Sequence, residues 1–317
     1  MWKRFKKSLF LSIGLVVLLA GCSDGDNANA GDSAKLNVVT TFYPMYEFSR
    51  QVGGEHANVI ALIPPGAEPH DWEPSAKDMA KLKKADIFVY NGVVEGWVAD
   101  ALSSAANDKR IVVEASKGIA LMEGLPEEEE EGEKEHGHKH EGPILDPHVW
   151  LDPVLAQREV ASIEAAFEQA DPGNKDVYKK NADAYIAKLK ELDATYKAGL
   201  KDVKRKEFVT QHAAFGYLAK EYGLTQVPIA GLSPEQEPSP DKLADIITFA
   251  RKNQVKTIFF ETLVEPKVAK VVANEIGAKT DVLNPLEGLT NEDRKKNLDY
   301  IGIMINNLEA LKKALNE

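Results

Sequence analysis

Three histidines occupy loops that should each follow a β-strand. His70 lies in a proline-rich loop, His148 follows an Asp-Pro pair, and His212 comes directly after a β-branched run. In open α/β sheets, ligands bind beyond the carboxyl ends of the strands. A single histidine in such a place is commonly a core residue bonded to the backbone. Three of them in equivalent places indicate one shared site.

A carboxylate would complete a tetrahedral set with these imidazoles. Glu287 follows the last expected strand and fits that role. Imidazole nitrogens with one carboxylate suit Zn²⁺ at about 2.0–2.2 Å, whereas more oxygen ligands would favour Mn²⁺. Glu261 and Asp281 are alternatives, either as the fourth ligand or as partners of the outer imidazole N–H groups. The predicted metal ligands are His70, His148, His212 and Glu287.

A second group of histidines lies in a low-complexity segment, residues 126–142, which holds eight glutamates and three histidines. Such a composition cannot build a core and predicts a surface loop. One interpretation makes His136, His138 and His140 auxiliary ligands that gather Zn²⁺ weakly near the main site. The alternative is a solvated acidic linker.

Short β-branched runs alternate with amphipathic stretches from residue 35 onward, which predicts parallel α/β units. Four strands are expected in each half of the chain. They are Leu36–Thr41, Asn58–Ile63, Asp86–Asn91 and Arg110–Glu114, then Glu207–Gln211, Leu224–Ile229, Thr257–Phe260 and Thr280–Leu283. Helices should begin after Ser75, Asp152 and Ser239, whose side chains can cap them. The last helix should bury Ile301, Ile305, Leu308, Leu311 and Leu315.

Residues 174–204 carry one apolar stripe and no proline. A single helix of that length would rise about 46 Å, so we expect a rigid strut between two lobes; two helices broken near Gly199 are the alternative. The fold class is therefore α/β, with two lobes that each hold a mainly parallel four-stranded sheet flanked by helices. The expected divisions are a signal peptide (1–21), a flexible leash (22–34), an N-terminal lobe (35–173), the linking helix (174–204) and a C-terminal lobe (205–317).

The first residues predict export. Four basic residues precede a mainly apolar run, Ser8–Ala20, which is too short to stay in a bilayer as a spanning helix. Leu19-Ala20-Gly21-Cys22 resembles a bacterial lipobox, in which the peptide is cut before a cysteine that is then lipidated. Cys22 is the only cysteine, so no disulfide can form within the chain. The alternative is an ordinary signal peptide with an incidental cysteine.

The net charge excludes some partners. Loss of the four basic leader residues would change the formal charge from −11 to −15. Such a chain is unsuited to nucleic acid and to electrostatic attachment to anionic lipid. We expect a monomer that reaches the membrane through lipid on Cys22.

Four motifs together resemble the zinc-specific substrate-binding lipoproteins of bacterial ABC importers, and the resemblance runs from the lipobox to the C-terminus. The motifs are Thr-Thr-Phe-Tyr-Pro (40–44), Glu-Pro-His-Asp-Trp-Glu-Pro (68–74), Asp-Pro-His-Val-Trp (146–150) and Gln-His-Ala-Ala-Phe-Gly-Tyr (211–217). The resemblance implies two lobes joined by a long helix, a metal ion held between them, and delivery to a membrane permease and its ATPase. Manganese members place a carboxylate at the position of His212 and an aspartate at that of Glu287, which favours zinc here.

Catalysis and adhesion are alternatives to zinc capture. A secreted zinc enzyme would need an open coordination position, but the chain has no His-Glu-x-x-His or Gly-x-Ser-x-Gly motif. We therefore predict that it is not an enzyme. Surface lipoproteins of this kind have also been described as adhesins, and no feature of the sequence tests that function.

Overall fold

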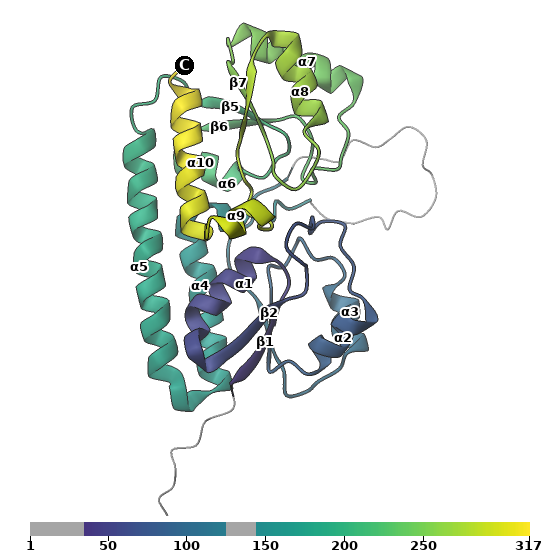
Figure 1. The fold of residues 1–317 in the computed structure, drawn as a ribbon, viewed down its shortest axis with the longest axis vertical. Helices are drawn as coiled ribbons and strands as arrows, with labels where there is room; N and C mark the ends of the chain where they lie inside the picture. The colour runs from purple at the N-terminus through teal and green to yellow at the C-terminus, as the bar shows by residue number, and fades with distance from the viewer. Residues whose placement is uncertain (1–34, 125–143) are drawn as a thin grey trace, which may run out of the picture. The chain divides into compact units, whose positions relative to one another are not determined.

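The computed structural model describes residues 35–124 and 144–317, which belong to one compact unit. Two four-stranded parallel sheets form its framework (Figure 1). The first has the order β2-β1-β3-β4 and the second β6-β5-β7-β8. The strands are β1 (Leu36–Thr40), β2 (Ala57–Ala61), β3 (Ile87–Tyr90), β4 (Ile111–Glu114), β5 (Glu207–Thr210), β6 (Thr225–Pro228), β7 (Thr257–Phe260) and β8 (Lys279–Val282). All eight predicted strands and the two-lobed α/β fold class are confirmed.

Helices connect and cover these strands. The first lobe has α1 (Tyr43–Gly53), α2 (Ala76–Lys83), α3 (Val98–Ser104), α4 (Pro153–Ala170) and the 3₁₀ turns η1 (Gly54–His56), η2 (Val149–Leu151) and η3 (Pro172–Asn174). The second has α6 (Gly216–Glu221), α7 (Pro240–Lys252), α8 (Lys267–Ile276), α9 (Asn291–Lys295) and α10 (Tyr300–Leu315). The predicted caps Ser75, Asp152 and Ser239 each accept a hydrogen bond from a first-turn backbone N–H.

The long helix α5 (Lys175–Leu200) links the lobes and is continuous through Gly199, so the alternative of two helices is wrong. It packs against α1 and α4 of the first lobe and α10 of the second (Figure 1). The predicted stripe is buried along its whole length: Tyr178, Ala182, Tyr185, Leu189, Leu192 and Tyr196.

The buried face of α10 differs from the prediction. Ile305 is 43% exposed, whereas Tyr300 and Met304 are fully buried. Leu308, Leu311 and Leu315 are buried as predicted. The apolar residues of this helix fit two adjacent faces, and packing against α5 and Trp150 selects the one that begins at Tyr300.

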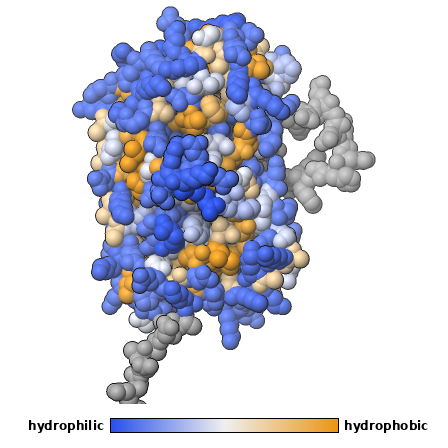
Figure 2. Space-filling model, viewed as in Figure 1, coloured by the Kyte–Doolittle hydropathy of each residue, from blue (hydrophilic) through white to orange (hydrophobic). Residues whose placement is uncertain are grey.

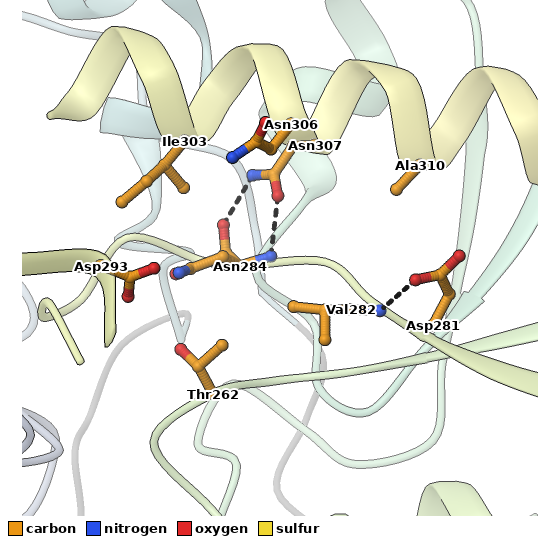
Figure 3. A pocket seen from close by; sticks show the side chains of 9 residues that line it. All are labelled: Thr262, Asp281, Val282, Asn284, Asp293, Ile303, Asn306, Asn307 and Ala310. Carbon is orange, nitrogen blue, oxygen red and sulfur yellow. Dashed lines mark hydrogen bonds between the residues drawn. The ribbon is translucent and has the colours of Figure 1, made fainter. Parts of the chain in front are cut away.

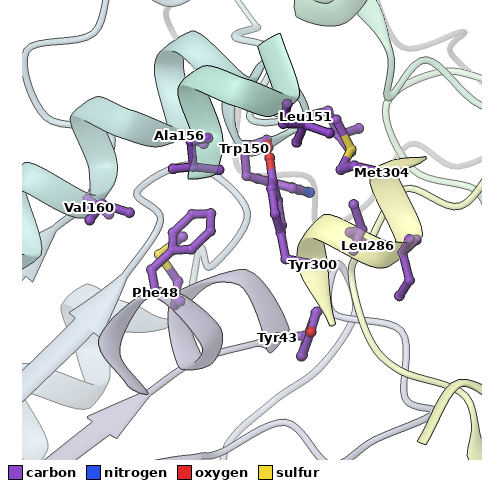
Figure 4. Close-up of a cluster of buried hydrophobic side chains, with 14 of the residues drawn as sticks. Tyr43, Phe48, Trp150, Leu151, Ala156, Val160, Leu286, Tyr300 and Met304 are labelled. Atoms are coloured by element: carbon purple, nitrogen blue, oxygen red, sulfur yellow. Dashed lines mark hydrogen bonds between the residues drawn. The ribbon is translucent and has the colours of Figure 1, made fainter. Parts of the chain in front are cut away.

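One hydrophobic cluster continues through both lobes. Phe48 of α1, Trp150 of η2, and Tyr300 and Met304 of α10 belong to it (Figure 4). Phe48 and Tyr300 are in edge contact, with ring centroids 5.1 Å apart, and the Tyr300 hydroxyl donates to the carbonyl of Trp150 at 2.5 Å. Because close-packed interiors resist deformation, this shared core favours a fixed arrangement of the two lobes.

Exposed hydrophobic residues are scattered. Among the described residues, the large ones are Val93, Val112, Val271 and Ile305. Figure 2 shows one face of the molecule, where hydrophobic residues form small separate groups within a hydrophilic surface. None of the helices in residues 35–124 and 144–317 has the length and apolarity that crossing a membrane requires.

Candidate metal centre

Two of the histidines are presented by the same local turn, in which an acid and a proline precede the histidine. The Glu68 carboxylate accepts from the backbone N–H of His70 at 2.9 Å, and the Asp146 carboxylate accepts from that of His148 at 3.0 Å. Asp146 also contacts the ring, with Oδ1 2.8 Å from Nδ1 of His148. The turn therefore fixes the backbone at both histidines, and in His148 it also orients the ring and leaves Nε2 available to a metal ion.

His212 follows β5 and is fully buried. Its carbonyl accepts from Thr210 Oγ1 at 2.7 Å and from Gln226 Nε2 at 2.8 Å, which fixes the backbone where the strand ends. Its Nδ1 contacts the carboxylate of Glu261, the residue that follows β7. Glu261 therefore orients the imidazole and leaves Nε2 for a metal ion.

A constrained loop after β8 presents Glu287. The preceding residue, Leu286, has a positive φ of 60°, which is unfavourable for a branched side chain. Asn284 stabilises this turn by accepting from the Leu286 N–H at 2.8 Å. Asn307 of α10 in turn holds both the N–H and the carbonyl of Asn284, at 2.9 and 2.7 Å (Figure 3). Trp150 adds a bond from Nε1 to the Pro285 carbonyl at 2.8 Å.

The three imidazoles and this carboxylate converge at one point between the lobes. Glu287 Oε1 lies 3.1, 3.4 and 3.6 Å from the Nε2 atoms of His70, His148 and His212, in that order. The Nε2 atoms of His148 and His212 are 3.4 Å apart. Ligands about 2.0–2.1 Å from a tetrahedral Zn²⁺ would be separated by about 3.3–3.4 Å. These four separations are close to the edges of a zinc tetrahedron, and all four ligand atoms lie within 4.8 Å of one another.

Burial and close contact shift the pKa values of the groups in the metal-free site. Burial alone would lower the pKa of His212, but Glu261 and Glu287 outweigh it and raise that pKa to about 10. His148 behaves in the same way, since Asp146 and Glu287 raise its pKa against the effect of burial. For Glu287, burial acts to raise the pKa, and the three histidines hold it well below its usual value. The buried carboxylates thus favour positive charge at His148 and His212, the sign of charge that a bound cation would supply.

Glu287 also has an unused oxygen. The residue is 1% exposed, and within residues 35–124 and 144–317 its Oε2 has no hydrogen-bond partner. A buried acceptor without a partner costs about 1–3 kcal/mol. A bound cation would compensate that cost.

The structure also shows where the two alternative carboxylates, Glu261 and Asp281, lie. Glu261 lies behind His212, outside the set of converging ligand atoms. Asp281 pairs with Lys313 at 2.9 Å and lines a separate pocket beside α10 (Figure 3), so its proposed contact with the site is wrong. Cys22 and the loop histidines His136, His138 and His140 lie outside the described residues.

Sequence reasoning missed the roles of Asp146 and Glu68. Each stands two residues before a histidine in an acid-Pro-His pattern, and that repeat was the available signal. Glu68 Oε1 lies 3.9 Å from Nε2 of His70, the one histidine of the set whose side chain keeps some exposure, at 11%. These two residues therefore mark the side of the site that is nearest to solvent.

Known proteins that this chain resembles are named for zinc uptake or zinc binding. Residues 38–314 match the family model described as "Zinc-uptake complex component A periplasmic". A Bacillus subtilis (strain 168) protein named high-affinity zinc uptake system protein ZnuA is 53% identical over 316 residues, which is 98% of each chain. The zinc-binding lipoprotein AdcA of Streptococcus pneumoniae (strain ATCC BAA-255 / R6) is 46% identical over 98% of this chain.

The AdcA match covers only part of that relative, since the chain spans 61% of its length. A solved structure, the Zn(II)-bound ZnuA-like domain of Streptococcus pneumoniae AdcA, superposes with a TM-score of 0.75 at 45% identity. It covers 89% of this chain and the whole of that domain.

Proposed function

The chain belongs to the family of zinc-uptake complex component A proteins, and on this premise we propose that it captures Zn²⁺ outside the cell and delivers it to an ABC-type permease with its ATPase. The observation that carries the proposal is the convergence of three imidazole nitrogens and one carboxylate oxygen within 4.8 Å of one another. Their number, chemistry and spacing suit a tetrahedral Zn²⁺.

The ligands in this proposal are His70, His148, His212 and Glu287. His70 and His148 come from the first lobe, and His212 and Glu287 come from the second, so an ion held by them would join the two lobes. Manganese prefers more oxygen ligands, and three nitrogens favour zinc over it. Copper would also bind such a set well, so capture of zinc in the cell depends on supply as well as on the site.

We propose a transport role in preference to catalysis. Catalytic zinc sites keep one position open for water or substrate. Here Glu287 supplies a fourth ligand, and the unused nitrogens of His148 and His212 are occupied by Asp146 and Glu261. A closed site of this kind suits binding and release.

His212→Glu tests the metal preference. It replaces a nitrogen ligand with oxygen and adds a negative charge beside Glu287, so zinc affinity should fall and the preference for Mn²⁺ over Zn²⁺ should rise. Competition titrations with a chromophoric chelator measure both. His56→Gln is the control, because His56 lies in η1 beside Tyr178, away from the converging ligand atoms. Unchanged zinc affinity in His212→Glu would contradict the assignment.

We further propose that the protein is a monomer tethered through lipid on Cys22, with residues 22–34 as the leash. The support is the lipobox-like Leu-Ala-Gly-Cys sequence and the name of the AdcA relative, a zinc-binding lipoprotein. The division into lobes 35–173 and 205–317, joined by 174–204, belongs to the same proposal. Cys22→Ser should release the protein from the membrane fraction into the medium, and a variant that stays in the membrane fraction would contradict lipid anchoring.

The acidic histidine segment remains a separate prediction. If His136, His138 and His140 collect zinc, deletion of residues 127–141 should slow growth at scarce zinc and leave the tight site intact. The same growth as wild type under a strong chelator would favour a solvated linker.

A further inference from the structure

The side chain of Tyr217, a residue of the second lobe, packs against the first lobe. It lies in the first turn of α6, five residues after His212, and is 3% exposed. Its side chain packs in a small hydrophobic cluster with Ile119 and Val149, both from the first lobe. Val149 is the residue after His148, so the ring of Tyr217 lies close to the backbone of a ligand from the opposite lobe.

The hydroxyl of Tyr217 is fully used at this contact. It donates to the carbonyl of Asp146 at 2.8 Å and accepts from the backbone N–H of Met122 at 2.8 Å. The Asp146 N–H also donates to the Met122 carbonyl at 2.9 Å. Tyr217 thus joins two segments of the first lobe that are already bonded to each other.

The side chain of Asp146 also makes contacts that fix its position. Its carboxylate orients His148 through both the ring and the backbone N–H. On the other side, a Cβ atom added to Gly216 would lie only 2.8 Å from Asp146 Oδ2. The first two residues of α6 therefore face Asp146 at two points: Tyr217 bonds to its carbonyl, and Gly216 leaves open the space beside its carboxylate.

We infer that Tyr217 is a positioning residue for zinc binding: from the second lobe it fixes Asp146, and through Asp146 it orients the ligand His148 of the first lobe. Gly216 leaves the space that the Asp146 carboxylate needs. The inference rests on the proposed function, since it takes His148 as a zinc ligand. It makes the geometry of a first-lobe ligand depend on a contact between the lobes.

Tyr217→Phe tests this directly, because it removes the hydroxyl and keeps the ring. Loss of a group that orients a metal ligand typically costs 10–100-fold in metal affinity, and we expect about 10-fold, with faster zinc dissociation. In the Co²⁺-loaded protein, the visible absorption bands should also change, which a purely structural role would not cause. Tyr222→Phe is the matched control, since its hydroxyl bonds to Asp193 at 3.2 Å within the helical layer.

A double-mutant cycle tests the route of the effect. If Tyr217 acts through Asp146, then Tyr217→Phe should have little further effect on zinc affinity in an Asp146→Ala background. The same loss in both backgrounds would overturn the route through Asp146.

Gly216→Ala provides an independent variant that removes no hydrogen bond. Its methyl group should displace the Asp146 carboxylate and weaken zinc binding, whereas Gly96→Ala should not, because a Cβ there meets nothing within 4 Å. If Tyr217→Phe fails to fold, the zinc affinity of Gly216→Ala decides whether α6 positions Asp146 for zinc binding. Wild-type affinity and Co²⁺ spectra in the variants would overturn the inference, while failure of the wild type to bind zinc would overturn the proposed function.

Discussion

Glu287 Oε1 lies 3.1 Å from Nε2 of His70, although 217 residues separate them in the chain and they come from different lobes. The same oxygen is within 3.6 Å of the Nε2 atoms of His148 and His212. One carboxylate oxygen thus serves as the common neighbour of three imidazoles. In the metal-free protein it helps to raise the pKa values of His148 and His212, and we propose that in the loaded protein it becomes the fourth ligand.

Glu287→Gln and Glu261→Gln should differ in their effect on zinc affinity. Glu261 contacts the outer nitrogen of His212, and loss of such a partner costs about 10–100-fold. Glu287 supplies a ligand atom and a charge, so Glu287→Gln should cost more than that. Chelator competition with the two variants side by side measures the difference, and a larger loss in Glu261→Gln would reverse the assignment.

Zinc binding should release protons. His148 and His212 both have raised pKa values in the metal-free protein, that of His212 about 10, and only neutral imidazole binds a metal ion. At pH 7 we expect the binding of each Zn²⁺ to release at least about one proton. The affinity for zinc should therefore weaken as pH falls. Calorimetry in buffers of different ionisation enthalpy counts these protons. A binding enthalpy that does not depend on the buffer would contradict the prediction.

The stability of the metal-free protein should fall as pH rises, through His212. A raised folded-state pKa stabilises the folded protein fully below the unfolded value of 6.5, and this contribution is lost as pH rises toward about 10. The melting temperature of the metal-free wild type should therefore fall more between pH 6.5 and 9 than that of His212→Gln. Equal slopes would show that His212 is not held in its charged form.

Asn307→Leu should weaken both folding and zinc binding. It removes two hydrogen bonds to Asn284 and leaves a buried N–H and carbonyl without partners, at about 1–3 kcal/mol for each unsatisfied group. Since Asn284 shapes the turn at Leu286, the carboxylate of Glu287 should also be displaced. Asn306→Leu, at the exposed neighbouring position that lines the same pocket (Figure 3), is the control. Equal unfolding free energies in the two variants would contradict this role.

The fold was predictable because its signals are local. β-branched runs marked all eight strands, and caps such as Ser75 and Asp152 marked helix starts within a residue. The buried face of α10 was not predictable from periodicity, since Ile305 and Met304 are both apolar and only packing against α5 and Trp150 distinguishes them.

The candidate site was predictable in part. His70 and His212 follow β2 and β5 as predicted, and the carboxyl ends of parallel strands meet at one edge of a sheet. The prediction that His148 also follows a strand is wrong, since it lies directly before η2. The choice between Glu261 and Glu287 stayed open, because both follow strands of the second sheet. The turn at Leu286 decides which carboxylate faces the imidazoles, and its positive φ is a property of tertiary structure. Tyr217 was visible only as part of a motif, and its contact with Asp146 requires the lobes to be in place.

The most direct test of the central claim is a crystal structure of the zinc-loaded protein with anomalous scattering at the zinc edge. We predict a single strong peak between the lobes at about 2.0–2.1 Å from the Nε2 atoms of His70, His148 and His212 and from a carboxylate oxygen of Glu287, with no bound water. Three protein ligands with an ordered water, or an ion bound by Glu261 in place of Glu287, would contradict it.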